Sequence, residues 1–128
     1  KLGVIADQKA DRVSLYQLHF PNPVVPLGRQ MEGMRRVLDR GLATHAGVSR
    51  YSRRRWLAAD RALGRPVLAN QVRYNLLQRG PERDLVPFAA REGRLVVAYS
   101  PLAQGLLGGR YGPANLPRDL RRGNPLFT

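Results

Sequence analysis

The feature that most constrains this chain is the alternation of short apolar segments with segments of helical character. Apolar, β-branched and aromatic residues gather in residues 13–19, 46–48, 67–72 and 95–99, and turn or polar residues follow each segment. Strands that alternate with helices predict a parallel sheet with helical crossovers, so we predict an α/β fold in the order β, α, β, α, β, α, β. The continuous apolar character of the strands predicts burial on both faces.

The intervening segments carry helix signals. In the first, apolar residues recur in steps of three and four, at Leu27, Met31, Met34 and Leu38. Gly41 is placed to cap the carboxyl end of this helix. Ser52 is the expected N-cap of a second helix that ends at Gly64. A third helix is expected to begin at residues 81–84, where acidic side chains favour a helix amino terminus, and to end near Gly93.

Composition narrows the function classes. The chain has 128 residues, the size of one domain, and no apolar run near the roughly 20 residues that span a bilayer, so no membrane partner is expected. It has no cysteine, which excludes disulfides and thiolate ligands and is compatible with a cytoplasmic protein. Nothing in the sequence indicates a metal site.

The formal net charge of +13 comes almost entirely from arginine, since Lys1 and Lys9 are the only lysines. The arginines are scattered over many segments, a distribution typical of solvated helix faces. One cluster, at residues 53–55, lies beside Tyr51 and Trp56. A basic nucleic-acid-binding module remains an alternative, and it predicts an affinity that falls steeply with salt. The chain carries no nucleic-acid-binding motif, so the favoured expectation is no nucleic-acid partner.

Each predicted strand ends in polar or aromatic groups that an apolar core does not need: His19, Ser49, Asn70 with Gln71, and Tyr99 with Ser100. Successive ends lie 22 to 30 residues apart, the length of single β–α units. The carboxyl ends of parallel strands face one way and carry the chemistry of α/β barrels, so we expect these groups to converge on one mouth. The alternative for each residue alone is structural. A histidine can pack at a strand end, a serine can start a turn, and amides can satisfy backbone groups.

Four motifs carry a family resemblance: YQLHFPNP at 16–23, GVSRYS at 47–52, NQVRYN at 70–75 and AYSPLAQGLLGGRY at 98–111. Their residues, order and spacing resemble the aldo-keto reductase family. The resemblance implies an oxidoreductase that reduces aldehydes and ketones with NADPH, or less often NADH, on an eight-stranded barrel. This chain would supply its fourth to seventh β/α units, a partial (β/α)8 TIM barrel. Residues 1–128 are then one segment of that barrel, with 112–128 a Pro/Gly/Arg-rich loop or tail.

The resemblance also implies roles for individual residues. His19 matches the active-site histidine that polarises the substrate carbonyl. Tyr99 matches the aromatic that stacks on the nicotinamide, and Ser49 and Gln71 match its carboxamide contacts. Arg50 stands where most members have asparagine, although members similar to potassium-channel β subunits have arginine there. The loop that wraps the cofactor pyrophosphate is matched by Ser100, Leu102, Gln104 and Gly105.

The family's catalytic tyrosine, aspartate and lysine are expected to precede residue 1, so we predict that the 128 residues alone are inactive. A four-stranded sheet would also expose strand edges at 13–19 and 95–99, which invite association. A non-catalytic subunit similar to potassium-channel β subunits stays open as the alternative function. The small-molecule carbonyl substrate, the choice between NADPH and NADH and the oligomeric state are not set by these residues.

Overall fold

The protein is described by a computed structural model that covers residues 11–109, 111, 115, 116, 118 and 119. Four parallel strands form one sheet in the order β1-β2-β3-β4, and this confirms the predicted α/β architecture. The strands are β1 (Val13–Leu18), β2 (Ala43–Ser49), β3 (Ala69–Arg73) and β4 (Leu95–Tyr99). Most of the predicted tail at 112–128 lies outside the described residues.

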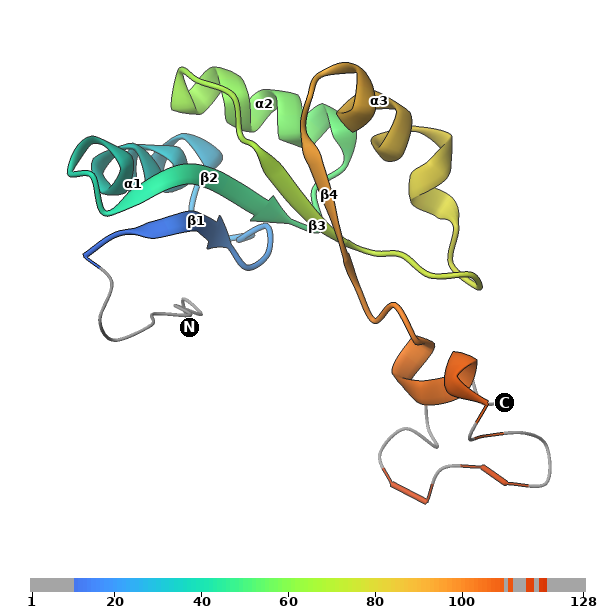
Figure 1. The fold of residues 1–128 in the computed structure, drawn as a ribbon. Helices are drawn as coiled ribbons and strands as arrows, with labels where there is room; N and C mark the ends of the chain where they lie inside the picture. Colours follow the sequence, from blue (N-terminus) through green and yellow to red (C-terminus); the bar gives the residue numbers. More distant parts are fainter. Residues whose placement is uncertain (1–10, 110, 112–114, 117, 120–128) are drawn as a thin grey trace.

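The helices are α1 (Leu27–Asp39), α2 (Arg53–Leu63) and α3 (Leu85–Arg91), with shorter 3-10 helices η1 (Gly80–Arg83) and η2 (Ala103–Gly108). Figure 1 shows α1, α2 and α3 on the same face of the sheet. The predicted caps are confirmed. Ser52 Oγ accepts a hydrogen bond from the Arg55 amide at 3.3 Å, and Gly64 has a left-handed φ of 78°. Among the described residues no helix is long and apolar enough to cross a membrane.

The third helix differs from the prediction, because two elements replace one. The chain leaves helical geometry at Asp84, with φ −144°, between η1 and α3. A continuous helix from 81 would place Pro87 in its interior, where the ring clashes with the carbonyl of Arg83. Restarting at Leu85 puts Pro87 in the first turn, where its missing N–H needs no partner.

The core lies between the sheet and the helices. Its largest fully buried side chains include Trp56, Met31 and Leu63, and Trp56 meets Phe88 edge to face at 5.4 Å between ring centroids. An ionic contact supports this cluster, since Arg94 donates to Asp60 at 2.6 Å and its guanidinium lies over the Trp56 and Phe88 rings.

Strand β3 begins two residues later than predicted. Val67 is fully buried, but its backbone pairs with side chains: its N–H donates to Asp60 Oδ1 at 2.8 Å, and its carbonyl accepts from Trp56 Nε1 at 2.9 Å. These helix-borne groups take the positions that a neighbouring strand would fill. The prediction included residues 67 and 68 because they continue the apolar run, but they lie outside the hydrogen-bonded strand.

The opposite face of the sheet is open in the described residues, so the prediction of burial on both faces is wrong here. On β4, Leu95 is 53% exposed and Val97 is 36% exposed. The apolar pattern of this strand predicted a second covering layer, and the described residues do not provide one. The same face carries the polar side chains of the candidate site.

Candidate functional site

The carboxyl ends of β2 and β3 are tied together by one backbone carbonyl. Gln71 is paired in register with Ser49, and its carbonyl accepts from Ser49 Oγ at 3.1 Å and from the Arg50 amide at 2.8 Å. Ser49 is 3% exposed, so these contacts are held away from solvent. Two of the predicted cofactor residues thus meet at adjacent strand ends.

The Gln71 side chain has a partner that the sequence did not single out. Gln17 Nε2 donates to Gln71 Oε1 at 2.7 Å across 54 residues of sequence. Gly47 lies between them in the sheet, and a β-carbon there would come within 3.3 Å of Gln17. Gln17 precedes His19 by two residues, so the alternation of a strand was the available signal that both belong to one face.

Two arginine side chains make cation–π contacts with the Tyr99 ring at the end of β4. The Arg50 guanidinium lies 5.4 Å from the ring centroid, and the Arg73 guanidinium lies 5.5 Å from it. Arg73 is Tyr99's register partner on β3, two residues beyond Gln71. Arg73 was missed by the sequence reasoning, although the same alternation puts it on the face of Gln71.

Several residues in the loops after β2 and β4 have left-handed backbone conformations. Among the described residues, four other than glycine have positive φ: Arg50 (60°), Ser100 (54°), Ala103 (48°) and Gln104 (60°). Such conformations cost free energy and concentrate at functional loops. Gly105, at φ 98°, continues the series, and the neighbouring Leu102 is 59% exposed. The segment matched to the pyrophosphate loop is therefore a sharply turned one.

His19 and Asn70 lie differently from one another. His19 follows β1 directly, is exposed, and packs edge to face against Phe20 with 5.7 Å between centroids. Asn70 is fully buried on the helix side, where its side chain donates to the Tyr51 carbonyl at 2.8 Å and accepts from the Tyr51 amide at 3.3 Å. Asn70 is thus a structural amide, the alternative that the sequence left open, and Gln71 alone faces the site.

A polar network occupies the loop after β3. Tyr74 donates its hydroxyl hydrogen to Glu82 Oε1 at 2.8 Å, and Arg79 contacts both oxygens of the same carboxylate. Hydrogen bonds from Arg79 and then Tyr74 lower the pKa of Glu82, and the bond to Glu82 raises the pKa of Tyr74. The network fixes the course of the chain from β3 to η1.

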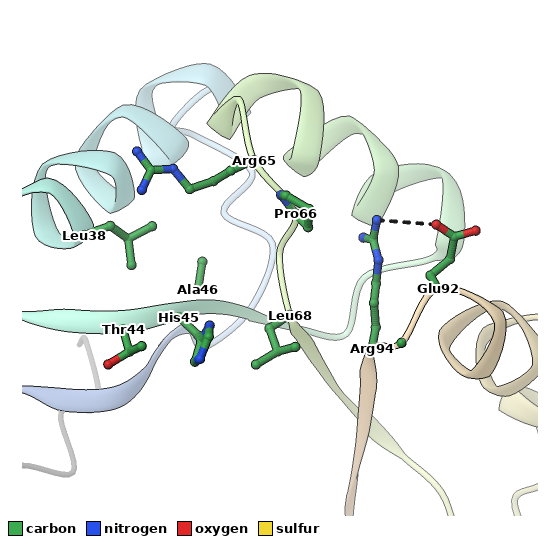
Figure 2. Close-up of a pocket in the computed structure, with 10 residues that line it drawn as sticks. Leu38, Thr44, His45, Ala46, Arg65, Pro66, Leu68, Glu92 and Arg94 are labelled. Atoms are coloured by element: carbon green, nitrogen blue, oxygen red, sulfur yellow. Dashed lines mark ion pairs between the residues drawn. The ribbon is translucent and has the colours of Figure 1, made fainter.

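A cavity of about 290 Å³ opens at the other end of the sheet, among residues that begin β2 and precede β3 and β4 (Figure 2). Its walls include His45, Arg65 and Arg94, and the dashed line in Figure 2 marks the 4.0 Å pair between Arg94 and Glu92. The amino ends of barrel strands serve stability rather than chemistry. The candidate site therefore lies at the carboxyl ends of the strands, at the opposite end of the sheet from this cavity.

Comparisons with known proteins identify the fold class first. The chain superposes on the glycerol dehydrogenase of Gluconobacter oxydans with a TM-score of 0.80 and 28% identity, over 92% of this chain and 36% of that one. It also matches an aldo/keto reductase of Klebsiella pneumoniae solved with NADP and acetate, with a TM-score of 0.61 and 33% identity, over 74% of this chain and 34% of that one. The four β/α units are part of a TIM-barrel-like α/β fold.

The sequence comparisons then identify the family. Residues 6–124 match the description "Aldo/keto reductase family". An uncharacterised oxidoreductase of Mycobacterium tuberculosis is 58% identical over 117 residues, which are 91% of this chain and 36% of that protein. A probable voltage-gated potassium channel subunit beta of Oryza sativa is 31% identical, over 87% of this chain and 35% of that protein. The chain belongs to the aldo/keto reductase family and spans about a third of the length of these relatives.

Proposed function

We propose that this chain supplies the nicotinamide-binding edge and one substrate-polarising histidine of an NADPH-dependent carbonyl reductase. The observation that carries the proposal is the placement of Ser49, Gln71 and Tyr99 at the carboxyl ends of the neighbouring strands β2, β3 and β4, with Ser49 bonded to the Gln71 carbonyl. A solved relative from Klebsiella pneumoniae holds NADP, which supports a nicotinamide cofactor for this family member. When bound, NADPH supplies the hydride that reduces an aldehyde or ketone carbon.

The residues fit this cofactor chemically. Gln71 uses its side-chain oxygen to accept from Gln17, so its NH₂ group stays free to donate to a carboxamide oxygen. Tyr99 belongs to the same open face of the sheet, two residues beyond Val97, which is the register partner of Gln71 on β4. Two such contacts fix the face of a planar ring, which is a positioning role.

The loop after β4 fits a diphosphate. The positive φ angles of Ser100 and Gln104 and the glycine at 105 turn the backbone sharply, and this allows close approach of a phosphate to main-chain N–H groups. We assign Ser100, Leu102, Gln104 and Gly105 to that contact, and Arg50 to the nicotinamide end of the same cofactor.

His19 acts on the substrate. It lies at the end of β1, next to the edge that carries Ser49, and is exposed toward solvent. A neutral imidazole donates one hydrogen bond to the carbonyl oxygen as negative charge develops there. We assign the protonation of this oxygen to a tyrosine of the full-length protein, as the family resemblance implies.

The test is reduction of a simple aldehyde by the full-length protein and its His19→Ala variant. Loss of one donor to a developing oxyanion lowers kcat by about 10²-fold or more, while NADPH affinity is unchanged. Equal kcat in the two proteins would remove His19 from the mechanism. Weakened NADPH binding in the variant would instead give this histidine a role in cofactor binding.

A second function is a reductase-like subunit of a potassium channel. It is favoured by Arg50 and by the 31% identity to the probable channel subunit from Oryza sativa. This function predicts NADPH binding with no measurable turnover of any aldehyde by the full-length protein. The kinetic test of His19 therefore separates the two functions, because turnover by the unmodified protein supports the enzyme.

A further inference from the structure

Asn75, in the loop after β3, uses the full hydrogen-bonding capacity of its side chain. Asn75 Oδ1 accepts from the backbone amides of Leu77 and Gln78, each at 3.0 Å. Asn75 Nδ2 donates to Gln78 Oε1 at 3.1 Å and to the Ser100 carbonyl at 3.0 Å. A primary amide has two N–H donors and one oxygen with two lone pairs, so all four positions are filled. The residue is 8% exposed, and these bonds are therefore partly shielded from water.

The bond from Asn75 to Ser100 differs from the other three because it joins two loops. It spans 25 residues, from the loop after β3 to the loop after β4. The other three bonds close the turn in which Asn75 itself lies, as asparagine side chains commonly do. The backbones of the two strand ends also meet here, since the Tyr74 amide donates to the Tyr99 carbonyl at 3.4 Å. The backbone turn needs only the side-chain oxygen, so it does not require the bond from Nδ2 to Ser100.

Ser100 begins the loop that we assign to the diphosphate. Its backbone has a left-handed φ of 54°, which costs free energy in a residue other than glycine. Its carbonyl also accepts from the Ala103 amide at 2.9 Å, in the turn that leads into η2. Asn75 thus bonds the carbonyl on which this turn is built, and two donors hold that carbonyl in one direction.

We propose that Asn75 is a positioning residue that holds the loop after β4 in the conformation that binds the cofactor diphosphate. The inference rests on the proposed function, because Ser100, Gln104 and Gly105 are assigned to that contact. Asn75 needs no contact with the cofactor, since it acts through the Ser100 carbonyl. A loop that is held in place before its ligand arrives loses less conformational freedom on binding, so the affinity is higher.

Three variants of the full-length protein separate the bond to Ser100 from the local turn. Asn75→Asp keeps the oxygen that accepts from the two turn amides but has no hydrogen to donate to Ser100, since an ionised carboxylate only accepts. Asn75→Ala loses all four bonds. Gln78→Ala is the matched control, because it removes the other acceptor of Asn75 Nδ2 and leaves the bond to Ser100.

Calorimetric titration with NADPH measures the effect on cofactor binding. Asn75→Asp should weaken binding about tenfold, because it removes the hydrogen bond and turns a carboxylate oxygen toward a carbonyl oxygen. Asn75→Ala should weaken binding about fivefold, and Gln78→Ala should bind as the unmodified protein does. A purely local role predicts a different order, in which Asn75→Asp binds normally because its turn is intact. That order, or equal affinity in all four proteins, would overturn the proposal.

Hydrogen exchange without NADPH, followed by NMR, tests the same bond independently of the cofactor. The Ala103 amide should exchange about fivefold faster in Asn75→Asp than in the unmodified protein. The Trp56 amide in α2, which donates to the Ser52 carbonyl at 2.8 Å, should exchange at an unchanged rate.

Unchanged exchange at Ala103 would overturn the positioning role. Faster exchange of both amides, in Asn75→Asp and Asn75→Ala alike, would give Asn75 a role in global stability and overturn it as well. If NADPH does not bind to the unmodified protein, the proposed function fails, and the exchange measurement still decides whether Asn75 holds this loop.

Discussion

The pair formed by Gln17 and Gln71 shows how a single hydrogen bond can prepare a site. Gln71 is half-buried, and its amide oxygen is occupied by Gln17 at 2.7 Å. A carboxamide fixed in this way presents its NH₂ group in one direction. Neither residue would be singled out by hydrophobicity, and only the alternation of β1 and the matched motif on β3 point to them.

We therefore expect Gln17→Ala to weaken NADPH binding about fivefold, the value of roughly 1 kcal/mol for one net hydrogen bond. The variant removes no proposed cofactor contact, so its effect would come through the orientation of Gln71. Gln30→Ala is the control, since the Gln30 side chain bonds the Val25 carbonyl on the exposed surface. Calorimetric titration with NADPH measures both, and matched affinities for the two variants would contradict the role of Gln17.

Glu82 gives a prediction in pH. Its pKa lies below the ordinary glutamate value because Arg79 and Tyr74 donate to the ionised carboxylate. A depressed folded-state pKa stabilises the loop above the unfolded pKa, and this stability is lost as pH falls through the folded value. The Tyr74 ring signals in NMR should thus titrate with a midpoint below about 4.3, the usual glutamate pKa. A midpoint at or above that value, or an unchanged profile in Glu82→Gln, would exclude the network as the cause.

At the scale of elements, local chemistry made α1 and α2 predictable and left α3 and β3 less so. Ser52, Gly64 and Gly41 are read from the sequence because each performs its task within one turn. Pro87 was a local signal that the prediction passed over. The start of β3 was beyond local reading, because the backbone of Val67 is paired by Asp60 and Trp56 from α2.

Asp60 is accordingly the element-scale residue to test. It holds the Val67 amide and pairs with Arg94, and both side chains of that pair are mostly buried, at 10% and 15% exposure. Asp60→Ala leaves the buried Arg94 with only the Glu92 carboxylate, 4.0 Å away, and should lower the free energy of unfolding by about 3 kcal/mol or more. Asp39→Ala, which breaks the exposed pair with Arg65, should cost less than about 1 kcal/mol. Urea unfolding measures the stability of both variants. A similar loss of unfolding free energy in the two would contradict the structural role of Asp60.

At the scale of the whole molecule, the helices α1, α2 and α3 cover one face of the sheet (Figure 1). Within the described residues the second face is open, and the polar side chains of the candidate site lie on it. The order of strands and their parallel direction followed from the sequence pattern. The open face did not, because apolar strands signal burial without saying which chain segment provides it. The chain spans about a third of the length of relatives such as the mycobacterial oxidoreductase.

The central claim is that the carboxyl ends of β2, β3 and β4 bind a nicotinamide cofactor. Titration of the full-length protein with NADPH, followed by calorimetry, tests this claim most directly. Saturable binding is expected, weakened about tenfold or more in both Gln71→Ala and Tyr99→Ala. Binding should be unchanged in Leu76→Ala, whose side chain is 78% exposed in a different loop. Absence of NADPH binding, or equal affinity in all four proteins, would contradict the account.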